Sequence, residues 1–417
     1  MTFRLYTLGC KMNAYESEAI REKLLKAGLE EKKEGEADLF FVNTCAVTKV
    51  AENKDKKLVR ELSRTYPHSR IFVMGCSSQI HPEWYRSIDH VEGVTGTERR
   101  EDLLTCLSGG SISLTKDTRS FVFDSDLSIS SSAHEAKAYI KVQDGCNNFC
   151  SYCIVPYTRG VSRSRSHVSV LEEAKRLLAN GEKELILGGI DVGSYKDPNE
   201  EDYRLKHLLR DLATLEPEKD YRVRVSSIEA SQIDDEYISL FHDYPDKICP
   251  HFHIPLQSGC QKILTLMNRR YSLKAYEEMC DKIKKEVPDV GLSTDIILGF
   301  PGETEEDFEE TLAFLKRIGF LRIHAFPYSE REGTPAASLR TGVVPMEVRR
   351  ERTRKVITLG KELEKQYRLE HKGEKVKVLI ENVTEGGIAT GYSGNYLPFS
   401  FSAPKAKVDT FVEREID

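Results

Sequence analysis

The chain has 417 residues, of which 39% are hydrophobic and 31% charged, and its formal net charge is -6. This composition is ordinary for a globular protein of about two to four domains, and it excludes a globally basic nucleic-acid binder, so any RNA contact must come from local patches. Ten cysteines in so long a chain do not indicate a small secreted disulfide scaffold, and no apolar stretch approaches the length of a membrane span. Because no charged-then-apolar signal segment precedes the first strand-like run, we expect a reducing cytoplasmic compartment.

The first hundred residues alternate between strand and helix patterns. Strands are expected at residues 4–8, 38–42 and 71–74, and helices at 17–27 and 49–66. This alternation predicts a parallel sheet with right-handed crossovers, that is, a Rossmann-like α/β domain over residues 1–108. Residues 109–134 have the composition of a linker, with one short strand expected at 120–123.

The strand–helix alternation resumes at residue 138. Six strands are expected, at 138–143, 184–187, 222–226, 251–254, 291–297 and 321–326, with helices such as 169–180 and 304–318 between them. Six βα units predict a partial TIM-type (β/α)6 barrel over residues 135–344, with its sites at the carboxyl ends of the strands. A basic helical connection follows at 345–371, and the strand-like segment 372–417 is predicted to form a small β-barrel.

Three cysteines, Cys146, Cys150 and Cys153, are spaced C-x3-C-x2-C. Three thiolates so close together can hold three irons of a [4Fe-4S] cluster and leave the fourth iron open. An open iron is a position for chemistry, and it can chelate the amino and carboxylate groups of S-adenosylmethionine and pass an electron to it. The alternative is a zinc knot or three buried thiols, but zinc would need a fourth ligand nearby and His167 lies well downstream.

A second set of three cysteines is dispersed along the first domain. Cys10, Cys45 and Cys76 each come directly after a predicted strand. Because the carboxyl ends of parallel strands share one sheet edge, we expect these residues to converge on another three-thiolate metal site. The alternative is that each is simply a small buried residue. Core packing is the expectation for the other cysteines, which are Cys106, Cys249, Cys260 and Cys280.

Several motifs resemble those of the radical S-adenosylmethionine methylthiotransferases. They occupy residues 7–17, 43–45, 75–76, 143–160, 253–260, 267–270, 294–303 and 326–329. The tail from about Lys372 resembles the RNA-binding TRAM domain. The resemblance spans nearly the whole chain in the expected order.

The resemblance implies two [4Fe-4S] clusters. The central cluster, on Cys146, Cys150 and Cys153, would reduce S-adenosylmethionine. The auxiliary cluster, on Cys10, Cys45 and Cys76, would supply or carry the inserted sulfur. One S-adenosylmethionine would donate the methyl group and another would yield the radical, so that a C–H bond becomes C–S–CH3.

Within the family, Cys10-Lys-Met-Asn13 and the tail look most like the enzymes that act on N6-threonylcarbamoyladenosine beside the tRNA anticodon. The partners implied are tRNA, an electron donor such as flavodoxin or ferredoxin, and a sulfur source. Isopentenyladenosine in tRNA and a ribosomal-protein aspartate are the alternative substrates. A non-enzymatic alternative is an RNA-binding iron–sulfur sensor.

Residues that contact S-adenosylmethionine are expected beside the central cluster and at later strand ends. They are Tyr152, Gly188, Gly189, Asp191, Glu229, Gln257, Ser258 and Asp295. Strand-end glycines would let the backbone approach the cofactor. The chain departs from the family pattern at Glu229-Ala230, at Ser77-Ser78 and in the loose Gly188-Gly189-Ile-Asp191 element.

Cations and aromatic residues suggest RNA contacts in three places. Arg159, Arg163 and Arg165 fit either a phosphate or carboxylate ligand or a solvated face. Residues 347–368 hold eight Lys and Arg against four Asp and Glu, which is typical of an RNA track or of an exposed charged helix. In the tail, an aromatic surface for unpaired bases competes with a small-barrel core; its candidates are Tyr392, Tyr396 and Phe399 beside Lys375 and Lys377.

Overall fold

The computed structural model describes residues 1–98, 100, 102–105, 107, 112–115, 117–123, 127–131, 136–216, 218–339 and 342–417. Two compact units make up the chain. The first contains Met1–Ser130, Lys141–Ser169 and Ser329–Ala337, and the second contains Ser131–Ile140, Val170–Tyr328 and Ser338–Asp417. Within the described residues, no helix combines the length and apolar character that a membrane crossing needs.

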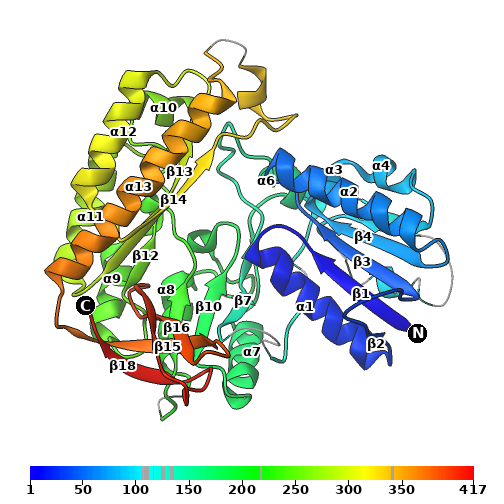
Figure 1. Ribbon diagram of the computed structural model, residues 1–417, viewed down its shortest axis with the longest axis horizontal. Coiled ribbons are helices and arrows are strands. Elements are labelled where there is room, and N and C mark those ends of the chain that lie inside the picture. Colours follow the sequence, from blue (N-terminus) through cyan, green and yellow to red (C-terminus); the bar gives the residue numbers. More distant parts are fainter. Residues whose placement is uncertain are drawn as a thin grey trace. The chain divides into compact units, whose positions relative to one another are not determined.

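The first unit is built on a six-stranded sheet with the order β2-β1-β3-β4-β5-β6, in which every neighbouring pair is parallel (Figure 1). Its strands are β1 (Thr2–Thr7), β2 (Glu30–Glu31), β3 (Leu39–Thr44), β4 (Arg70–Gly75), β5 (Val91–Thr95) and β6 (Ile112–Leu114). The three predicted strands are confirmed as β1, β3 and β4. Strand β5 is not predicted from the sequence pattern, because Glu92 and Gly93 interrupt its apolar run.

The prediction of a strand at residues 120–123 is wrong. A 3-10 turn, η2, occupies Thr118–Ser120, and residues 121–123 form no regular element. The cause is local: the Asp117 carboxylate accepts the Arg119 backbone N–H at 3.0 Å and caps the turn. The predicted linker instead contributes β6, which pairs with β5 in parallel.

Helices connect the strands of this sheet. They are α1 (Lys11–Lys26), α2 (Lys49–Thr65), α3 (Cys76–Ile80), α4 (Pro82–Arg86) and α5 (Asp102–Thr105). Val59 and Leu62 of α2 pack on Phe40 and Val42 of the sheet in a core that excludes water. Helix α1 begins six residues earlier than predicted, because its first two turns carry Asn13 and Glu16, which are polar yet buried.

The second unit contains six parallel strands in two three-stranded sheets, with the orders β11-β10-β7 and β12-β13-β14. The strands are β7 (Ala138–Lys141), β10 (Glu184–Gly188), β11 (Arg222–Val225), β12 (His251–His253), β13 (Gly291–Leu298) and β14 (Arg322–Pro327). The six strand predictions are thus confirmed. Two backbone hydrogen bonds link the sheets, from Cys249 N–H to Val223 O and from Ile228 N–H to His253 O.

Helices alternate with these strands, as expected for a βα architecture. They are α7 (His167–Ala179), α8 (Leu205–Thr214), α9 (Asp235–Asp243), α10 (Gln261–Leu266), α11 (Leu273–Glu286) and α12 (Glu305–Ile318). The long helix α13 (Met346–Glu370) packs along β14. Cys249, Cys260 and Cys280 are buried, as predicted, whereas Cys106 lies outside the described residues.

The chain ends in a four-stranded antiparallel sheet, β17-β16-β15-β18. Its strands are β15 (Lys375–Val383), β16 (Ile388–Ser393), β17 (Pro398–Ser402) and β18 (Phe411–Glu415). The sheet docks on the amino-terminal ends of the parallel strands: Arg222 donates to Tyr392 O at 3.0 Å and Arg224 donates to Gly394 O at 2.8 Å. Both arginines are paired with Glu184, which is fully buried at the start of β10.

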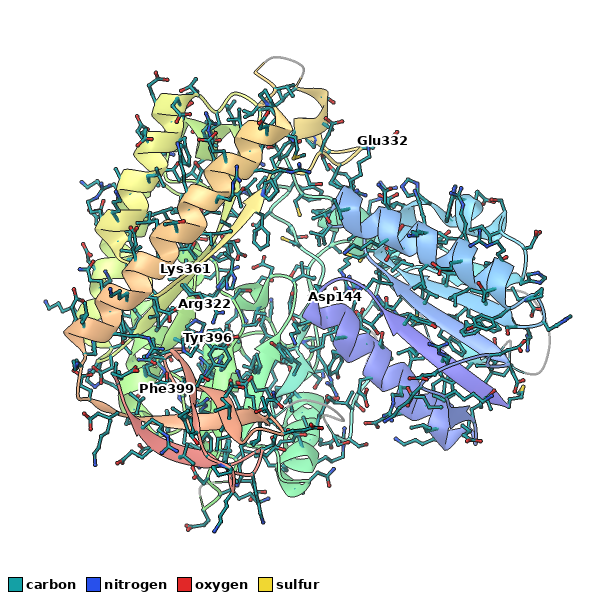
Figure 2. The ribbon with its side chains drawn as sticks, viewed as in Figure 1. Asp144, Arg322, Glu332, Lys361, Tyr396 and Phe399 are labelled. Carbon is teal, nitrogen blue, oxygen red and sulfur yellow. The ribbon has the colours of Figure 1, made fainter. Side chains whose placement is uncertain are left out.

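Tyr392 and Tyr396 belong to this docking contact rather than to an open aromatic surface. Their rings stack at 4.7 Å, and the Lys137 ammonium lies 4.5 and 4.9 Å from the two centroids. Arg322 lies 5.5 Å from each ring, and His251 stacks on Tyr396 (Figure 2). These rings are therefore already engaged by cations of their own unit.

The start of β13 allows only glycine where the terminal sheet approaches. A Cβ on Gly291 would lie 1.9 Å from the backbone oxygen of Asn395. We expect Gly291→Ala to lower the free energy of unfolding by about 1–3 kcal/mol, because backbone must move to relieve the overlap. Gly386→Ala is the matched control, since its Cβ would meet only Thr384 Oγ1 at 3.8 Å. Urea unfolding measures both, and equal stability of the two variants would contradict the docking geometry.

Candidate functional site

Cys10, Cys45 and Cys76 lie together at one edge of the first sheet. They follow β1, β3 and β4, which are adjacent parallel strands. A Cβ placed on Gly9 would come within 2.9 Å of Cys45 Sγ, and the charges of Cys76 and Cys10 both act on the Cys45 thiol. The topology therefore brings together three sulfurs that are far apart in the sequence.

Two glycines make this convergence possible. Gly9 precedes Cys10 with φ +108°, and Gly75 precedes Cys76 with φ +109°, a region that side chains rarely adopt. A Cβ on Gly75 would lie 2.5 Å from Asn43 Oδ1 and from Thr44 O. The repeated Gly-Cys pair thus has a structural cause: the chain must turn sharply at each strand end to present the sulfur.

The donor chemistry of this site fits a thiolate-bound cluster. Burial raises the pKa of the Cys45 thiol to about 12, and burial also raises the pKa of Cys76, against the opposing charges of Arg159 and Arg100. Free thiols with such pKa values stay protonated at neutral pH, so a metal that binds them must displace protons. Neighbouring cations would then offset the negative charge of the bound thiolates.

The central trio, which is Cys146, Cys150 and Cys153, lies on a loop of the same unit. This loop is closed at its base by a hydrogen bond from Cys146 N–H to Gly160 O, at 3.0 Å. Inside it, Cys153 N–H donates to Cys150 O at 3.0 Å, and Asn148 N–H donates to Cys146 Sγ at 3.4 Å. Backbone amides directed at sulfur stabilise the thiolate form that iron requires.

Small apolar contacts join the two trios inside the first unit. Ala46, which follows Cys45, packs with Cys76 and with Ile154, which follows Cys153. Helix α6 (Val155–Arg159) begins directly after this point, and Thr97 Oγ1 donates to Thr158 O at 2.6 Å. The loop of the central trio is therefore packed against the strand ends that carry the other trio.

Buried ion pairs of Glu16 and Asp144 form a network in the same unit. Glu16 of α1 is fully buried and contacts Arg100 at 2.8 Å, Arg159 at 2.8 Å and Lys141 at 2.7 Å. Asp144 contacts Lys141 at 2.8 Å, Arg159 at 3.0 Å and Arg163 at 2.8 Å; Figure 2 labels Asp144. The described residues joined by these pairs are four cations and two carboxylates.

Arg159 extends this network to the cysteines. Its guanidinium donates to Asn13 Oδ1 at 2.8 Å, and the Asn13 amide in turn donates to Leu8 O at 2.8 Å and to Thr44 O at 2.9 Å. Leu8 and Thr44 lie near the strand ends that lead into Cys10 and Cys45. An arginine beside the central loop thus orders the backbone of the other trio.

The sequence offered two readings of Arg159, Arg163 and Arg165, and the structure supports neither. These side chains are not a solvated face, because Arg159 is 1% exposed and Arg165 is 2% exposed. Nor are they open ligands for an external anion, because Arg159 and Arg163 are engaged by carboxylates and Arg165 donates to Ser169 Oγ at 2.9 Å. They hold the fold around the cysteines.

Residues 329–337, after the last parallel strand, fasten the first unit at two further points. Arg331 pairs with Glu52 of α2, which also contacts His81 at 3.0 Å. Ala336 N–H donates to Ser151 O, inside the loop of the central trio, at 2.8 Å. This segment therefore contacts both α2 and the cysteine loop.

Among the predicted cofactor residues of the second unit, Asp295 lies within β13, and the others come at or after the carboxyl ends of strands. Gly188 ends β10, and Gly189 and Asp191 follow it. Burial raises the pKa of Glu229, which pairs with Arg269, and the charges of Asp191 and Asp295 raise it further. These three carboxyl groups therefore lie near one another, in an arrangement suited to a cationic sulfonium or ammonium group.

Gln257 and Ser258 are placed differently from one another. Gln257 adopts φ +68° and exchanges backbone hydrogen bonds with β13, through Asp295 O and Ile297 N–H. Ser258 is 1% exposed, and its hydroxyl lies 3.5 Å from Thr311 Oγ1 of α12. Tyr152, on the cysteine loop of the first unit, is partly exposed. Contact of these residues with a cofactor stays a prediction.

Sequence reasoning missed most of the residues that order the site. Asn13 and Glu16 are three apart on α1, so they share a helix face, and this spacing was the available signal. Asp144 lies within the motif at 143–160, but nothing in the sequence showed that its carboxylate would be buried; Arg100 and Lys141 carried no signal, since isolated charges most often face solvent. Asp55 was also missed: its carboxylate accepts the Cys45 N–H at 2.6 Å.

Glu16→Gln tests the buried network. The substitution leaves Arg100, Arg159 and Lys141 facing a neutral amide, and we expect it to lower the free energy of unfolding by about 3–5 kcal/mol. Glu18→Gln, on the same helix, is the matched control. It removes a surface pair with Arg21 at 3.0 Å and should cost no more than about 1 kcal/mol. Urea unfolding at neutral pH compares the two.

The difference in stability between wild type and Glu16→Gln should depend on pH. Burial alone would raise the pKa of Glu16, but the charges of Arg100, Arg159 and Lys141 outweigh it and lower the pKa from 4.5 to about 2. The carboxylate therefore stabilises the native state fully above about pH 4.5 and loses this contribution as the pH falls toward 2. The stability gap between wild type and Glu16→Gln should shrink over that range, and a gap independent of pH would contradict the assignment.

Comparison with known proteins places this site in a family. Residues 140–315 match the Radical SAM superfamily, and residues 2–96 match the uncharacterized protein family UPF0004. The first match includes the loop of Cys146, Cys150 and Cys153, and the second includes Cys10, Cys45 and Cys76. Each cysteine trio thus falls within a separate family match.

Curated relatives match over almost their whole length. The threonylcarbamoyladenosine tRNA methylthiotransferase of Bacillus subtilis is 37% identical, over 100% of this chain and 93% of the relative. Its counterpart in Thermotoga maritima is 35% identical, over 96% and 91%. A tRNA-2-methylthio-N(6)-dimethylallyladenosine synthase of Lachnoclostridium phytofermentans is 34% identical, over 99% and 92%.

Solved structures show the same fold at low identity. The radical S-adenosylmethionine methyltransferase TsrM from Kitasatospora setae, with cobalamin and a [4Fe-4S] cluster bound, aligns with a TM-score of 0.59 at 14% identity. The alignment covers 80% of this chain and 76% of TsrM. With the full-length likeness to the curated relatives, the matches on both cysteine trios show that the chain belongs to the radical S-adenosylmethionine methylthiotransferase family.

Proposed function

We propose that this protein methylthiolates N6-threonylcarbamoyladenosine in tRNA, next to the anticodon, to give the 2-methylthio derivative. The observation that carries the proposal is the gathering of both cysteine trios in one compact unit, within a chain that resembles enzymes of that name from end to end. Relatives named for threonylcarbamoyladenosine match at 34–37% identity over 91–100% of this chain.

Six cysteines would hold two [4Fe-4S] clusters, of which the central one would pass the reducing electron to S-adenosylmethionine and the auxiliary one would supply or carry the inserted sulfur. Cys146, Cys150 and Cys153 would bind the central cluster. Cys10, Cys45 and Cys76 would bind the auxiliary cluster. The buried excess of positive charge around Glu16 and Asp144 supports this assignment, because it would offset the charge of thiolate-bound groups.

The second unit would bind S-adenosylmethionine at the carboxyl ends of its strands. Gly188 and Gly189 would admit the cofactor close to the backbone, and Asp191, Glu229 and Asp295 would attract its positive charges. Gln257 and Ser258 complete the proposed set in this unit, and Tyr152, on the cysteine loop of the first unit, is proposed as a further cofactor contact. Glu229 is already paired with Arg269, so it would act through that pair or exchange partners.

The finer architecture is part of the same proposal. We assign a Rossmann-like domain to residues 1–108, a partial (β/α)6 barrel to 135–344 and a TRAM-like RNA-binding domain to 372–417, with 109–134 and 345–371 as connections. The parallel sheets and the terminal antiparallel sheet support this division. A cytoplasmic location, an electron donor such as flavodoxin or ferredoxin, and a sulfur source follow from the proposed reaction.

Cysteine substitutions separate the two trios. Cys150→Ala should abolish both 5′-deoxyadenosine formation and the methylthio product. Cys45→Ala should retain 5′-deoxyadenosine formation but lose the product, and anaerobic iron analysis should give about half of the wild-type iron in each variant. The control is Cys280→Ala, a fully buried thiol of α11, which should keep wild-type iron content. Methylthiolation by the Cys45 variant would refute the auxiliary role.

Dimethylallyladenosine is another name for isopentenyladenosine. It is the second candidate substrate, because relatives named for it match this chain at 34–37% identity. Mass spectrometry of tRNA nucleosides from a deletion strain distinguishes the two. Loss of 2-methylthio-N6-threonylcarbamoyladenosine alone supports the proposal. Loss of the dimethylallyl product, or of neither nucleoside, would assign the enzyme to another substrate.

A further inference from the structure

Helix α13 uses its basic residues in two different ways. Arg349 is buried and donates to Val344 O at 2.8 Å and to Tyr328 O at 2.9 Å. Arg352 is buried against Glu303 at 2.7 Å and Glu305 at 2.8 Å. These cations fasten the helix to its own unit, so they do not remain available for a partner.

Other cations of the same helix are paired at the surface. Lys355 lies 3.4 Å from Glu351, and Arg368 lies 3.5 Å from Glu364 and 3.1 Å from Asp417. Four exposed residues remain that form no ion pair with any described residue: Arg350, Arg354, Lys361 and Lys365. We call these four the α13 stripe.

The four residues of the α13 stripe lie on one face of the helix. At 100° per residue, its members fall within an arc of about 60° on the helix. They extend over about 22 Å along the axis, at 1.5 Å per residue. The exposed Ile357 lies on the same line, with 42% of its surface accessible. In a protein of net charge -6, a line of cations without acidic partners forms a local positive surface that can attract an anion.

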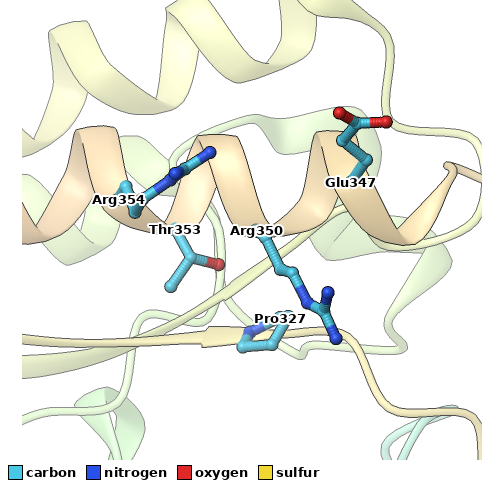
Figure 3. A pocket seen from close by; sticks show the side chains of 5 residues that line it. All are labelled: Pro327, Glu347, Arg350, Thr353 and Arg354. Atoms are coloured by element: carbon cyan, nitrogen blue, oxygen red, sulfur yellow. The ribbon is translucent and has the colours of Figure 1, made fainter.

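One end of the α13 stripe lies beside the carboxyl end of β14, and the other end lies near the terminal sheet. Arg350 and Arg354 line a hollow of about 630 Å³ together with Pro327, the last residue of β14 (Figure 3). The neighbouring Phe326 is 51% exposed at this carboxyl end. Beyond Lys365, the helix reaches the terminal sheet, where Tyr367 Oη bonds Asn395 Nδ2 at 2.9 Å. Figure 2 labels Lys361 midway along the helix.

We propose that the α13 stripe binds consecutive phosphates of the tRNA backbone and leads the substrate strand toward the carboxyl ends of the parallel strands. Guanidinium groups of Arg350 and Arg354 would pair with phosphate oxygens where the strand enters, since arginine binds phosphate with two parallel donors. Lys361 and Lys365 would follow the backbone as point charges. The inference rests on the proposed tRNA substrate and specifies which surface recognises it.

A line of cations fits a phosphate chain better than it fits the compact acidic face of an electron-transfer protein. Such a face would need a rounded patch of positive charge rather than a narrow one about 22 Å long. Glu347 also borders the hollow and limits the positive charge at the stripe's first turn. The length and the narrow arc of the stripe favour an elongated polyanion as the occupant, whereas the Glu347 carboxylate opposes one at the first turn.

The test measures how salt affects RNA binding. Anaerobically purified, cluster-loaded protein is titrated against a fluorescein-labelled unmodified tRNA transcript over a range of KCl concentrations. Replacing all four stripe residues by Gln should reduce the slope of log K against log salt by about 3, because each lost phosphate contact removes about 0.7–0.9. Arg350→Gln with Arg354→Gln alone should reduce it by about 1.5. The affinity should fall at least tenfold in the fourfold variant.

Controls separate the stripe from general effects. Lys175→Gln with Arg176→Gln neutralises two exposed cations of α7, and this double variant should leave the slope unchanged. The stripe side chains are exposed and form no ion pair with a described residue, so the fourfold variant should keep the urea unfolding midpoint of the wild type. Formation of 5′-deoxyadenosine without RNA should also stay at the wild-type level.

Each outcome has a defined meaning. An unchanged salt slope in the fourfold variant would overturn the proposal that the α13 stripe binds phosphates. An equal decrease of this slope in the α7 control would overturn it as well. Slower reduction by an acidic electron-transfer protein, with unchanged RNA binding, would assign the stripe to that partner and also overturn the proposal. Absence of tRNA binding and of methylthio product in the wild type would instead refute the proposed function, so the two failures are distinguishable.

Discussion

The first unit depends on a single buried carboxylate. Glu16 holds Arg100, Arg159 and Lys141 in a region without water, and Lys141 and Arg159 reach Asp144 beside the central cysteine loop. Removing charges from water is costly, and only close pairing and hydrogen bonding recover the cost. An apolar core would have been a simpler way to join the loop to the sheet. Arg159, Arg100 and Glu16 of this network also act electrostatically on the buried Cys76 thiol.

The network explains why two distant motifs form one site. Gly9 and Gly75 turn the chain at the ends of β1 and β4, and Asn13 binds the carbonyls of Leu8 and Thr44 near the same ends. Arg159 then connects Asn13 to the loop of the other trio. Residues 329–337 add a third attachment, through Glu52 and Ser151. Precise placement of reacting groups requires support of this kind around the ligands themselves.

The second unit divides its polar residues between two ends of the same strands. Carboxylates gather at the carboxyl ends, where the cofactor is proposed to bind. At the amino ends, Glu184 directs Arg222 and Arg224 toward carbonyl groups of the terminal sheet. The aromatic residues of that sheet are held among cations, and this leaves the unpaired cations of α13 as the clearer surface for a polyanion. Charge that is balanced internally builds the fold, and charge left unbalanced at the surface indicates a partner.

The sequence alone determined most of the strand and helix succession, the two cysteine trios and the family, but it did not determine β2, β5 or β6. Apolar runs and helical spacing are local properties, and the order of strands in a parallel sheet follows from chain connectivity. Tertiary structure decided the roles of the charged residues. Nothing local distinguishes Arg159, which is buried among carboxylates, from Arg350, which is exposed and unpaired, because burial and pairing depend on segments remote in the chain. For the same reason, only the folded chain could show that Glu16 pairs with Arg100, Arg159 and Lys141 in the unit that contains both trios, and that a short linker strand completes the first sheet.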